Sequence, residues 1–208
     1  MSKNFQVICC DCPWAFSDKL DMSTVSRGAA SNYATMTNQD LIDLPVGMLA
    51  DPAGCLLALW VPSSLLQTGL DVMKAWGFYQ KTSYVWVKTK KEPFKDKPTD
   101  LNTTLAFGMG RTFRAAHEIC LIGINNTGIY KQLENKSQRS VSLAENLGHS
   151  TKPENLQNSL ELMFPMATTN GTALEMFARR ERKGWVCVGN ETGNKEDIRL
   201  SLQTLIDG

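Results

Sequence analysis

Residues 5–14, FQVICCDCPW, decide the fold, because they join a short apolar run to an acidic residue and then to a proline. The apolar run, 5–10, is typical of a buried strand. Pro13 interrupts the run, so Asp11 stands at the end of the first predicted strand. Trp14 follows closely and adds an aromatic plane near that carboxylate.

Strand-like and helix-like segments alternate along the rest of the chain. Short apolar or alternating runs predict further strands at 55–61, 79–88, 117–124 and 185–188. Capping signals and helical spacing predict helices at 37–49, 62–76, 152–163 and 173–182. The end of the chain, 195–206, fits either a terminal helix or an edge element, and the polar segments 17–36, 88–114 and 125–149 are expected to be loops. This alternation predicts an α/β fold with a mostly parallel sheet and helices on both faces.

Length and composition place the chain among globular proteins. Its 208 residues fit one domain, so a single domain is expected over 1–208. Hydrophobic residues make up 42% and charged residues 21%, which excludes a predominantly disordered chain and a collagen-like repeat. The apolar runs are too short to span a bilayer, so no membrane association is expected. A net charge of +1 excludes a global basic field, and any nucleic-acid contact must come from local patches.

The six cysteines bear on compartment and metal binding. Most of them sit inside apolar runs, where buried free thiols are usually found. Because the chain opens without a secretory pattern, we expect a reducing, cytoplasmic location, in a bacterium or a phage-infected host cell. The spacing of Cys9, Cys10 and Cys12 matches neither a zinc knuckle nor a zinc finger, so no metal site is expected.

The first strand end suggests recognition of an amino group on a planar base. The Asp11 carboxylate and a backbone carbonyl of Cys12 or Pro13 can accept its two N–H groups, and the Trp14 indole can stack on the ring. Ligands of such sheets bind beyond the carboxyl ends of strands, which is where Asp11 is expected. Taken alone, the tetrapeptide fits equally well a turn aspartate followed by a core tryptophan.

A second strand end suggests a nucleoside site. The small-residue loop 167–172, with Asn170 and Gly171, is predicted to open the helix at 173–182. Glu191 follows the next predicted strand, and an acid in that position accepts ribose hydroxyls in dinucleotide-binding folds. The loop lacks the full G-x-G-x-x-G pattern, so a tight structural turn is the alternative interpretation.

These residues resemble a known family. Asp11-Cys12-Pro13-Trp14 resembles the Asp-Pro-Pro-Trp signature of the MT-A70 family of adenine N6-methyltransferases, with Cys12 in place of the first proline. Further blocks resemble the family in the same order, from about residue 5 to residue 191. They are 33–36, 44–46, 59–61, 77–78, 85–88, 108–111, 121–123, 149–153, 174–179, 184–185 and 189–191.

The resemblance implies a Rossmann-like methyltransferase domain that uses S-adenosylmethionine (SAM), with the catalytic signature before the cofactor motif. It implies methyl transfer to the exocyclic N6 of adenine, with the signature residues 11–14 catalytic: Asp11, Cys12, Pro13 and Trp14. The cofactor site is expected to combine the following residues from the resemblance and from the small-residue loop: Asp11, Lys152, Asn170, Gly171, Arg179, Asn190 and Glu191. In that site Lys152 would reach the SAM carboxylate or the target base, and Asn190 and Glu191 would hold the SAM ribose or adenine.

Basic residues in the polar loops are candidate contacts to a nucleic-acid backbone. They are Lys88, Lys90, Lys91, Arg111, Arg114 and Arg139. By resemblance to small phage and bacterial members, DNA is the expected acceptor and RNA the alternative. Because degenerate members of the family serve as scaffolds and Cys12 departs from the signature, a non-catalytic partner subunit is a further alternative. A homodimer or a complex with a partner subunit would fit either role.

Overall fold

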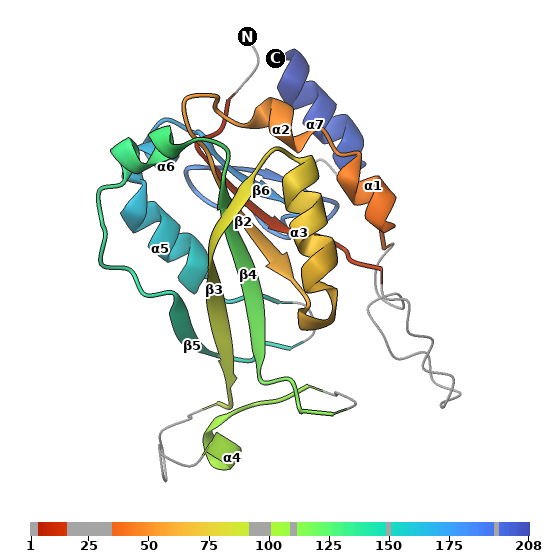
Figure 1. Ribbon diagram of the computed structural model, residues 1–208, viewed down its shortest axis with the longest axis vertical. Helices are drawn as coiled ribbons and strands as arrows, with labels where there is room; N and C mark the ends of the chain where they lie inside the picture. The colour runs from red at the N-terminus through yellow and green to blue at the C-terminus, as the bar shows by residue number, and fades with distance from the viewer. Residues whose placement is uncertain (1–3, 16–34, 92–100, 109–111, 149–150, 194–195) are drawn as a thin grey trace.

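The computed structural model describes residues 4–15, 35–91, 101–108, 112–148, 151–193 and 196–208. These residues build a seven-stranded sheet in the order β5-β3-β4-β2-β1-β6-β7, with helices on both faces (Figure 1). The strands are β1 (Val7–Asp11), β2 (Leu56–Val61), β3 (Tyr79–Thr89), β4 (His117–Ile124), β5 (Val141–Glu145), β6 (Ala173–Met176) and β7 (Trp185–Val188).

The sheet is mixed but mostly parallel, as the sequence predicts. Strand β1 pairs in parallel with β2 and β6, β6 pairs in parallel with β7, and β3 pairs in parallel with β5. Strand β4 is antiparallel to both β2 and β3. The amino end of β4 therefore lies at the same edge of the sheet as the carboxyl ends of β1, β2 and β3.

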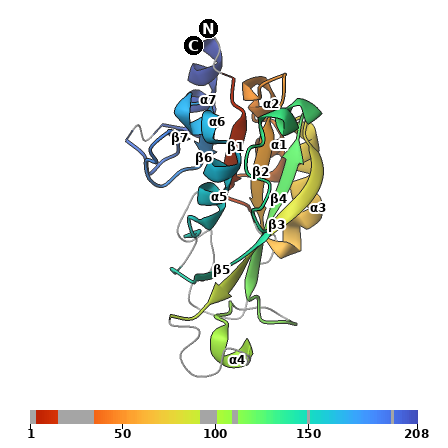
Figure 2. The same ribbon diagram turned by 90° about the vertical axis from the view of Figure 1, so that its left-hand side faces the viewer.

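Two hydrophobic clusters, one on each face, hold the helices to the sheet. Alternation along β1 sends Ile8 and Cys10 into one cluster and Val7 and Cys9 into the other. The first face is covered by α1 (Asn38–Ile42), α2 (Val46–Leu49), α3 (Leu66–Ala75) and α7 (Ile198–Asp207). The second face is covered by α5 (Asn155–Met163), α6 (Pro165–Thr169) and the 3-10 helix η3 (Thr127–Gln132) (Figure 2). The prediction of helices on both faces is confirmed.

The predicted helix at 173–182 is wrong. Residues Ala173–Met176 form the short strand β6, which pairs with β1 on one side and β7 on the other. The backbone then turns at Phe177, whose φ of 57° lies in the left-handed region that ends a regular element. Burial between two strands outweighs the helix propensity of these four residues.

Other predicted boundaries shift for local reasons. The helix expected at 37–49 is divided into α1 and α2, because Pro45 cannot continue the first one. The helix expected at 62–76 begins as a 3-10 turn, η2 (Ser63–Leu65), before α3. The predicted loops at 88–114 and 125–149 contain the short helix α4 (Leu101–Thr104) in the first, and η3 and strand β5 in the second.

Two other expectations concern cysteines and membranes. All six cysteines are free, and five of them are buried, as their apolar surroundings predict. Within the part of the chain that the structure describes, we find no helix long and apolar enough to cross a bilayer.

Candidate active site

A chain of alternating charges runs along the carboxyl edge of the sheet. The Lys152 Nζ atom donates to both carboxylate oxygens of Asp11, at 3.0 and 2.8 Å. The same ammonium lies 3.1 Å from Glu118 Oε2, and the Lys88 Nζ atom lies 2.6 Å from Glu118 Oε1. The order is therefore Asp11, Lys152, Glu118, Lys88, two acids and two cations in contact.

The topology explains how these four residues meet. Asp11 ends β1, while Glu118 is the second residue of the antiparallel strand β4 and so lies at the same edge. Lys152 comes from the segment that leads into α5, on the face that this helix covers. Its ammonium also lies 5.6 Å from the centroid of the Trp60 ring, and Trp60 is the register partner of Asp11 on β2. The cation is thus held by two carboxylates and an aromatic face.

Burial and charge act on these groups in opposite directions. Burial alone would lower the pKa of Lys152, but the charges of Asp11 and Glu118 raise it above its ordinary value. Burial would likewise raise the pKa of Glu118, yet Lys152 and Lys88 bring that pKa below its ordinary value. Lys152 and Glu118 are therefore both charged at neutral pH, and the ion pair between them persists there.

The turn after Asp11 presents two carbonyl groups. The Cys12 carbonyl accepts the backbone N–H of Trp14 at 2.9 Å, and the Pro13 carbonyl accepts that of Met36 at 2.9 Å. A carbonyl oxygen has two lone pairs, so each of these can accept one more hydrogen bond. The Cys12 side chain is buried, with its Sγ 3.2 Å from that of Cys10. Replacing the family's proline by Cys12 thus keeps the backbone acceptor.

The predicted stacking role of Trp14 is wrong. Its side chain is only 4% exposed and belongs to the hydrophobic core on one face of the sheet. Its indole N–H donates to the carbonyl of Trp60 at 2.9 Å. Trp14 therefore ties the turn after β1 to strand β2, and its ring is not available to a base. Trp60, Trp76 and Trp185 are buried core aromatics, as predicted.

The ends of β6 and β7 lie beside the end of β1. The backbone N–H of Ala178 donates to the carbonyl of Val188 at 2.9 Å. This bond joins the segment after β6 to the end of β7. A Cβ on Gly189 would come within 2.3 Å of the Ala178 carbonyl oxygen, so only glycine allows this approach. Next to it, Asn190 is exposed, and Glu191 lies 3.7 Å from the guanidinium of Arg179. Three of the residues predicted to bind the cofactor, Arg179, Asn190 and Glu191, are thus gathered at the same edge as Asp11.

Asn170 and Gly171 are not part of this cluster. They precede β6, and the register of β6 with β1 places them at the opposite edge of the sheet from Asp11. The hydroxyl of the following Thr172 bonds to the Gln6 side chain at 2.9 Å, which marks that amino edge. The loop opens a strand and not a helix, so it lacks the helix N-terminus that a nucleoside-binding loop of this kind needs.

The predicted nucleic-acid contacts divide into separate groups. Lys88 is paired with Glu118 and lies 5.1 Å from the centroid of the Trp86 ring, with its side chain only 16% exposed, so its ammonium is engaged within the site. Lys90, Lys91 and Arg114 lie together beyond the ends of β3 and β4, where Gly108 bridges to Ala115. Arg139 precedes β5, which pairs with the carboxyl half of β3, and lies at the start of that pairing, apart from the other cations. Arg111 lies outside the described residues.

Glu118 is the member of this ion-paired cluster that the sequence did not point to. It lies in the predicted strand 117–124, and the local sequence assigns it no role. If β4 ran parallel to its neighbours, its first residues would lie at the far edge of the sheet. The antiparallel pairing with β2 and β3 brings them to the site instead.

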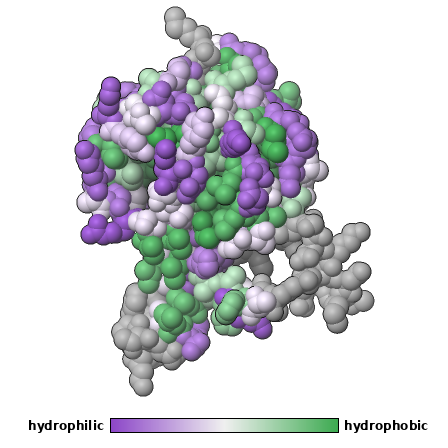
Figure 3. Space-filling view, viewed as in Figure 1, coloured by the Kyte–Doolittle hydropathy of each residue, from purple (hydrophilic) through white to green (hydrophobic). Residues whose placement is uncertain are grey.

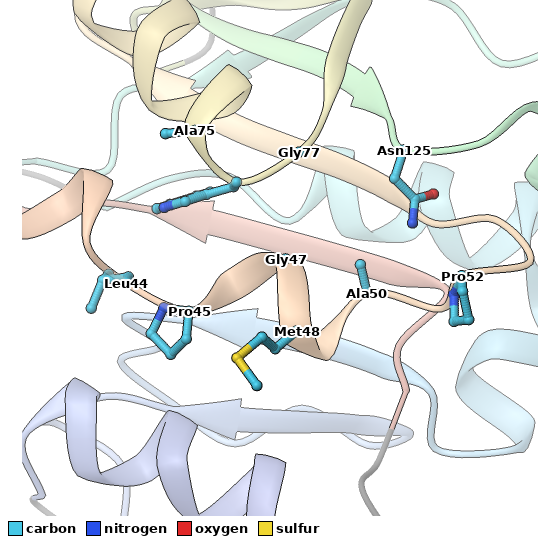
Figure 4. Close-up of a pocket in the computed structure, with 10 residues that line it drawn as sticks. Leu44, Pro45, Gly47, Met48, Ala50, Pro52, Ala75, Gly77 and Asn125 are labelled. Carbon is cyan, nitrogen blue, oxygen red and sulfur yellow. The ribbon is translucent and has the colours of Figure 1, made fainter.

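A pocket of about 470 Å³ lies elsewhere, between α2 and the end of α3 (Figure 4). It is lined mainly by apolar groups, including Met48 and Trp76, and by the amide of Asn125, which follows β4. It is therefore at the opposite edge of the sheet from Asp11. Among the described residues, no group of three or more His, Cys, Asp or Glu side chains is arranged to hold a metal ion.

Comparison with known proteins agrees with this geometry. Residues 5–191 match the model of the MT-A70 family. The chain belongs to the MT-A70 family. The match begins just before β1 and ends at Glu191, so it includes both halves of the site.

Two curated relatives of this MT-A70 chain come from eukaryotes. An N(6)-adenosine-methyltransferase MT-A70-like protein of Drosophila melanogaster is 27% identical over 208 residues, 97% of this chain and 29% of that protein. The N6-adenosine-methyltransferase non-catalytic subunit MTB of Arabidopsis thaliana is 30% identical over 124 residues, 59% of this chain and 14% of that protein. The chain thus spans less than a third of either relative. Neither relative supports the phage or bacterial type expected from the sequence.

Proposed function

We propose that this MT-A70 chain transfers a methyl group from SAM to the exocyclic N6 of adenine in a nucleic acid. The observation that carries the proposal is the Asp11 carboxylate, held by Lys152 at the edge of the sheet beside the joined ends of β6 and β7. One strand end offers acceptors for an amino group, and the neighbouring ones offer polar groups for a nucleoside. A substrate amine and a nucleoside cofactor need such adjacent positions.

The residues present fit SAM. Methyltransferases of the MT-A70 family use this cofactor. The exposed Asn190 and the half-exposed carboxylate of Glu191 are suited to hydrogen bonds with ribose hydroxyls. They directly follow Gly189, whose backbone packs closely against that of Ala178. When bound, SAM supplies an electrophilic methyl group on a sulfonium.

The role of Asp11 and the adjacent carbonyls is to orient the amino group. The nitrogen lone pair of adenine is delocalised into the ring, so the free amine is a poor nucleophile. A carboxylate oxygen of Asp11 and the carbonyl of Cys12 or Pro13 accept its two N–H bonds and favour a pyramidal nitrogen. Lys152 occupies part of the Asp11 carboxylate, which still offers further lone pairs. Asp11 need not remove a proton before attack, and most of the rate comes from positioning and electrostatics.

Glu118 and Lys88 support this arrangement from the other side. Glu118 binds the same ammonium as Asp11, and Lys88 in turn holds Glu118. Lys152 is thereby fixed between two carboxylates and keeps Asp11 in one orientation. Lys88 and Glu118 are positioning residues in this proposal.

The acceptor is either DNA or RNA. The sequence favours DNA, whereas the names of both curated relatives specify adenosine, the ribonucleoside. A target inside a duplex must be flipped out, which costs a few kcal/mol, so a single-stranded acceptor is the easier substrate in either case.

The experiment is methyl transfer from labelled SAM to adenine-containing DNA and RNA, each single- and double-stranded. We expect label at N6 of adenine in one of these nucleic acids and its loss in the Asp11→Ala variant, with SAM binding retained. Full activity of Asp11→Ala would refute the role of this carboxylate. Label at another position would refute the reaction.

A second candidate function is that of a non-catalytic subunit. It is favoured by Cys12 in the signature and by the Arabidopsis relative, whose name describes a non-catalytic subunit. Retention of Asp11, Lys152 and Glu118 in one ion-paired cluster favours the enzyme. SAM binding without transfer to any of the four acceptors would support the subunit role, with a partner chain supplying catalysis.

A further inference from the structure

Strands β3 and β4 continue beyond the candidate site into a projection, defined here as residues 89–91, 101–108 and 112–116. Thr89 bridges to Leu105 and Gly108 bridges to Ala115, so two chain segments stay paired after the regular strands end. Figures 1 and 2 show that this part, with α4 at its tip, extends away from the body of the molecule. The projection is joined directly to the site, because the N–H of Ala106 donates to the carbonyl of Lys88 at 3.0 Å.

Large apolar side chains are exposed on the projection. Phe113 is 89% exposed and Phe107 is 58% exposed. The guanidinium of Arg114 lies 5.9 Å from the centroid of the Phe107 ring. Figure 3 shows hydrophobic residues gathered over this lower part of the molecule. Single exposed apolar residues are common on protein surfaces, but two exposed aromatic rings on one projection, one of them beside an arginine guanidinium, are groups on which nucleic-acid bases can stack.

The charge of the projection indicates which kind of partner it can bind. Its described residues include the cations Lys90, Lys91 and Arg114 and no aspartate or glutamate. Lys90 uses its ammonium to bind the carbonyl of Asn102 at 2.8 Å, and so also fixes α4. A surface with positive charge and exposed aromatic faces matches a strand that carries phosphates and unstacked bases.

We propose that Phe107 and Phe113 stack on bases of single-stranded nucleic acid that flank the target adenine. The inference rests on the proposed function, because it takes the strand bound here to be the one whose adenine enters the site. Phe113 is five residues from Glu118, so at most about 17 Å of extended chain separates them. That distance corresponds to about five stacked nucleotides. The aromatic rings of the projection therefore stack on bases near the target adenine, and its cations contact the phosphates of the same strand.

Binding of short fluorescent oligonucleotides, measured by anisotropy in the presence of SAM, tests the proposal without relying on turnover. Phe113→Leu keeps an apolar side chain but removes the aromatic face, and we expect it to weaken binding about tenfold. Phe113→Trp keeps the stacking face and should bind as tightly as the wild type. Tyr79→Leu is the matched control, because Tyr79 is a 66% exposed aromatic residue at the other end of β3 and should leave binding unchanged.

A second measurement tests whether the loss of affinity in Phe113→Leu comes from a lost contact with a base. Oligonucleotides with abasic sites at each of about five positions on either side of the adenine should bind the wild type at least about tenfold more weakly. Phe113→Leu should then cause little further loss of affinity. Equal losses on intact and abasic strands would overturn the stacking role. If Phe113→Leu leaves oligonucleotide binding intact but converts a dimer into a monomer in light scattering, the surface binds a second copy of the chain and the proposal is wrong.

The two proposals fail separately. Normal methyl transfer with binding insensitive to Phe113→Leu would overturn the stacking surface and leave the proposed function standing. Stacking-dependent binding without transfer to any acceptor would support this surface and refute the enzymatic function.

Discussion

Lys152 binds Asp11 through both carboxylate oxygens, at 3.0 and 2.8 Å, although 141 residues separate the two in the sequence. The Lys152 side chain is only 15% exposed, so the pair is largely shielded from water. Such a pair fixes the orientation of the carboxylate, which is the property that recognition of an amino group requires. We therefore expect Lys152 to act mainly by holding Asp11, and less by contact with a cofactor carboxylate.

Substituting Lys152 by glutamine separates these two roles. We expect Lys152→Gln to lower kcat about 100-fold, because Asp11 is no longer held in one orientation, while the Kd for SAM changes much less. Single-turnover transfer and calorimetric SAM binding give the two quantities. Lys74→Gln, on the exposed side of α3, is the control and should change neither. A variant that loses SAM affinity but keeps its transfer rate would show that Lys152 serves the cofactor.

The Glu118 pairs predict a dependence of stability on pH. The pKa of Glu118 is lowered in the folded protein, so its contribution is present above its ordinary value of 4.5 and is lost as the pH falls through the lowered pKa. Glu118→Gln should therefore be less stable than the wild type at neutral pH. The difference should stay constant from about pH 7 to about pH 5 and shrink as the pH falls below 4.5 through the lowered pKa. Urea unfolding across that range measures it, and a difference independent of pH would exclude an electrostatic origin.

The parts of the fold that local pattern specifies were predictable. Strands β4 and β7 have the boundaries that their apolar runs predict, and both helical layers are present. Strand β6 was not predictable, because Ala, Leu, Glu and Met are all good helix formers and only pairing with β1 and β7 makes them a strand. Strand β5 was missed because it is short and partly exposed, so its apolar signal is weak.

The candidate site likewise combines features that the local sequence predicts with features that depend on the whole sheet. The sequence placed Asp11 and Glu191 at the carboxyl ends of strands, which share an edge in a parallel sheet, and in the structure β6 lies between their two strands. It did not reveal the Glu118–Lys152 contact, which depends on the reversed direction of β4. It also left open whether Trp14 is buried, since an aromatic residue after a strand suits a core and a binding surface equally. Pairing direction and burial are properties of the whole sheet, and a local motif carries neither.

The buried carboxyl of Glu175 predicts a pH dependence of stability that is opposite in sign to that of Glu118. It lies on β6 between Cys9 and Cys187, and its carboxylate accepts from Gln157 Nε2 at 3.0 Å. Burial raises its pKa above the ordinary value, so the folded state penalises the charged form as the pH rises. Glu175→Gln should then be more stable than the wild type near neutral pH, by a few degrees in Tm, since about 1 kcal/mol moves Tm by about 2–4 °C at this size.

Thermal unfolding between about pH 5 and pH 8 tests this, and the gain should grow with pH. Glu161→Gln is the matched control. Burial would raise the pKa of Glu161, but its hydrogen bonds from Arg182 and Trp185 lower it overall, so this variant should lose stability over the same range. A gain that is constant with pH would mean that packing, and not the buried charge, explains Glu175→Gln.

Gly189 makes the most specific prediction for the cofactor side of the site. A Cβ there would come within 2.3 Å of the Ala178 carbonyl oxygen, a backbone atom that cannot move without parting the ends of β6 and β7. Gly189→Ala should therefore displace Asn190 and Glu191 and weaken SAM binding at least about tenfold, with a loss of stability. Gly193→Ala is the matched control, because a Cβ at that position meets no described atom within 4 Å, and its SAM affinity should equal that of the wild type. If both variants bind SAM normally while Gly189→Ala is destabilised, the joined ends of β6 and β7 support the fold alone and the cofactor binds elsewhere on this edge.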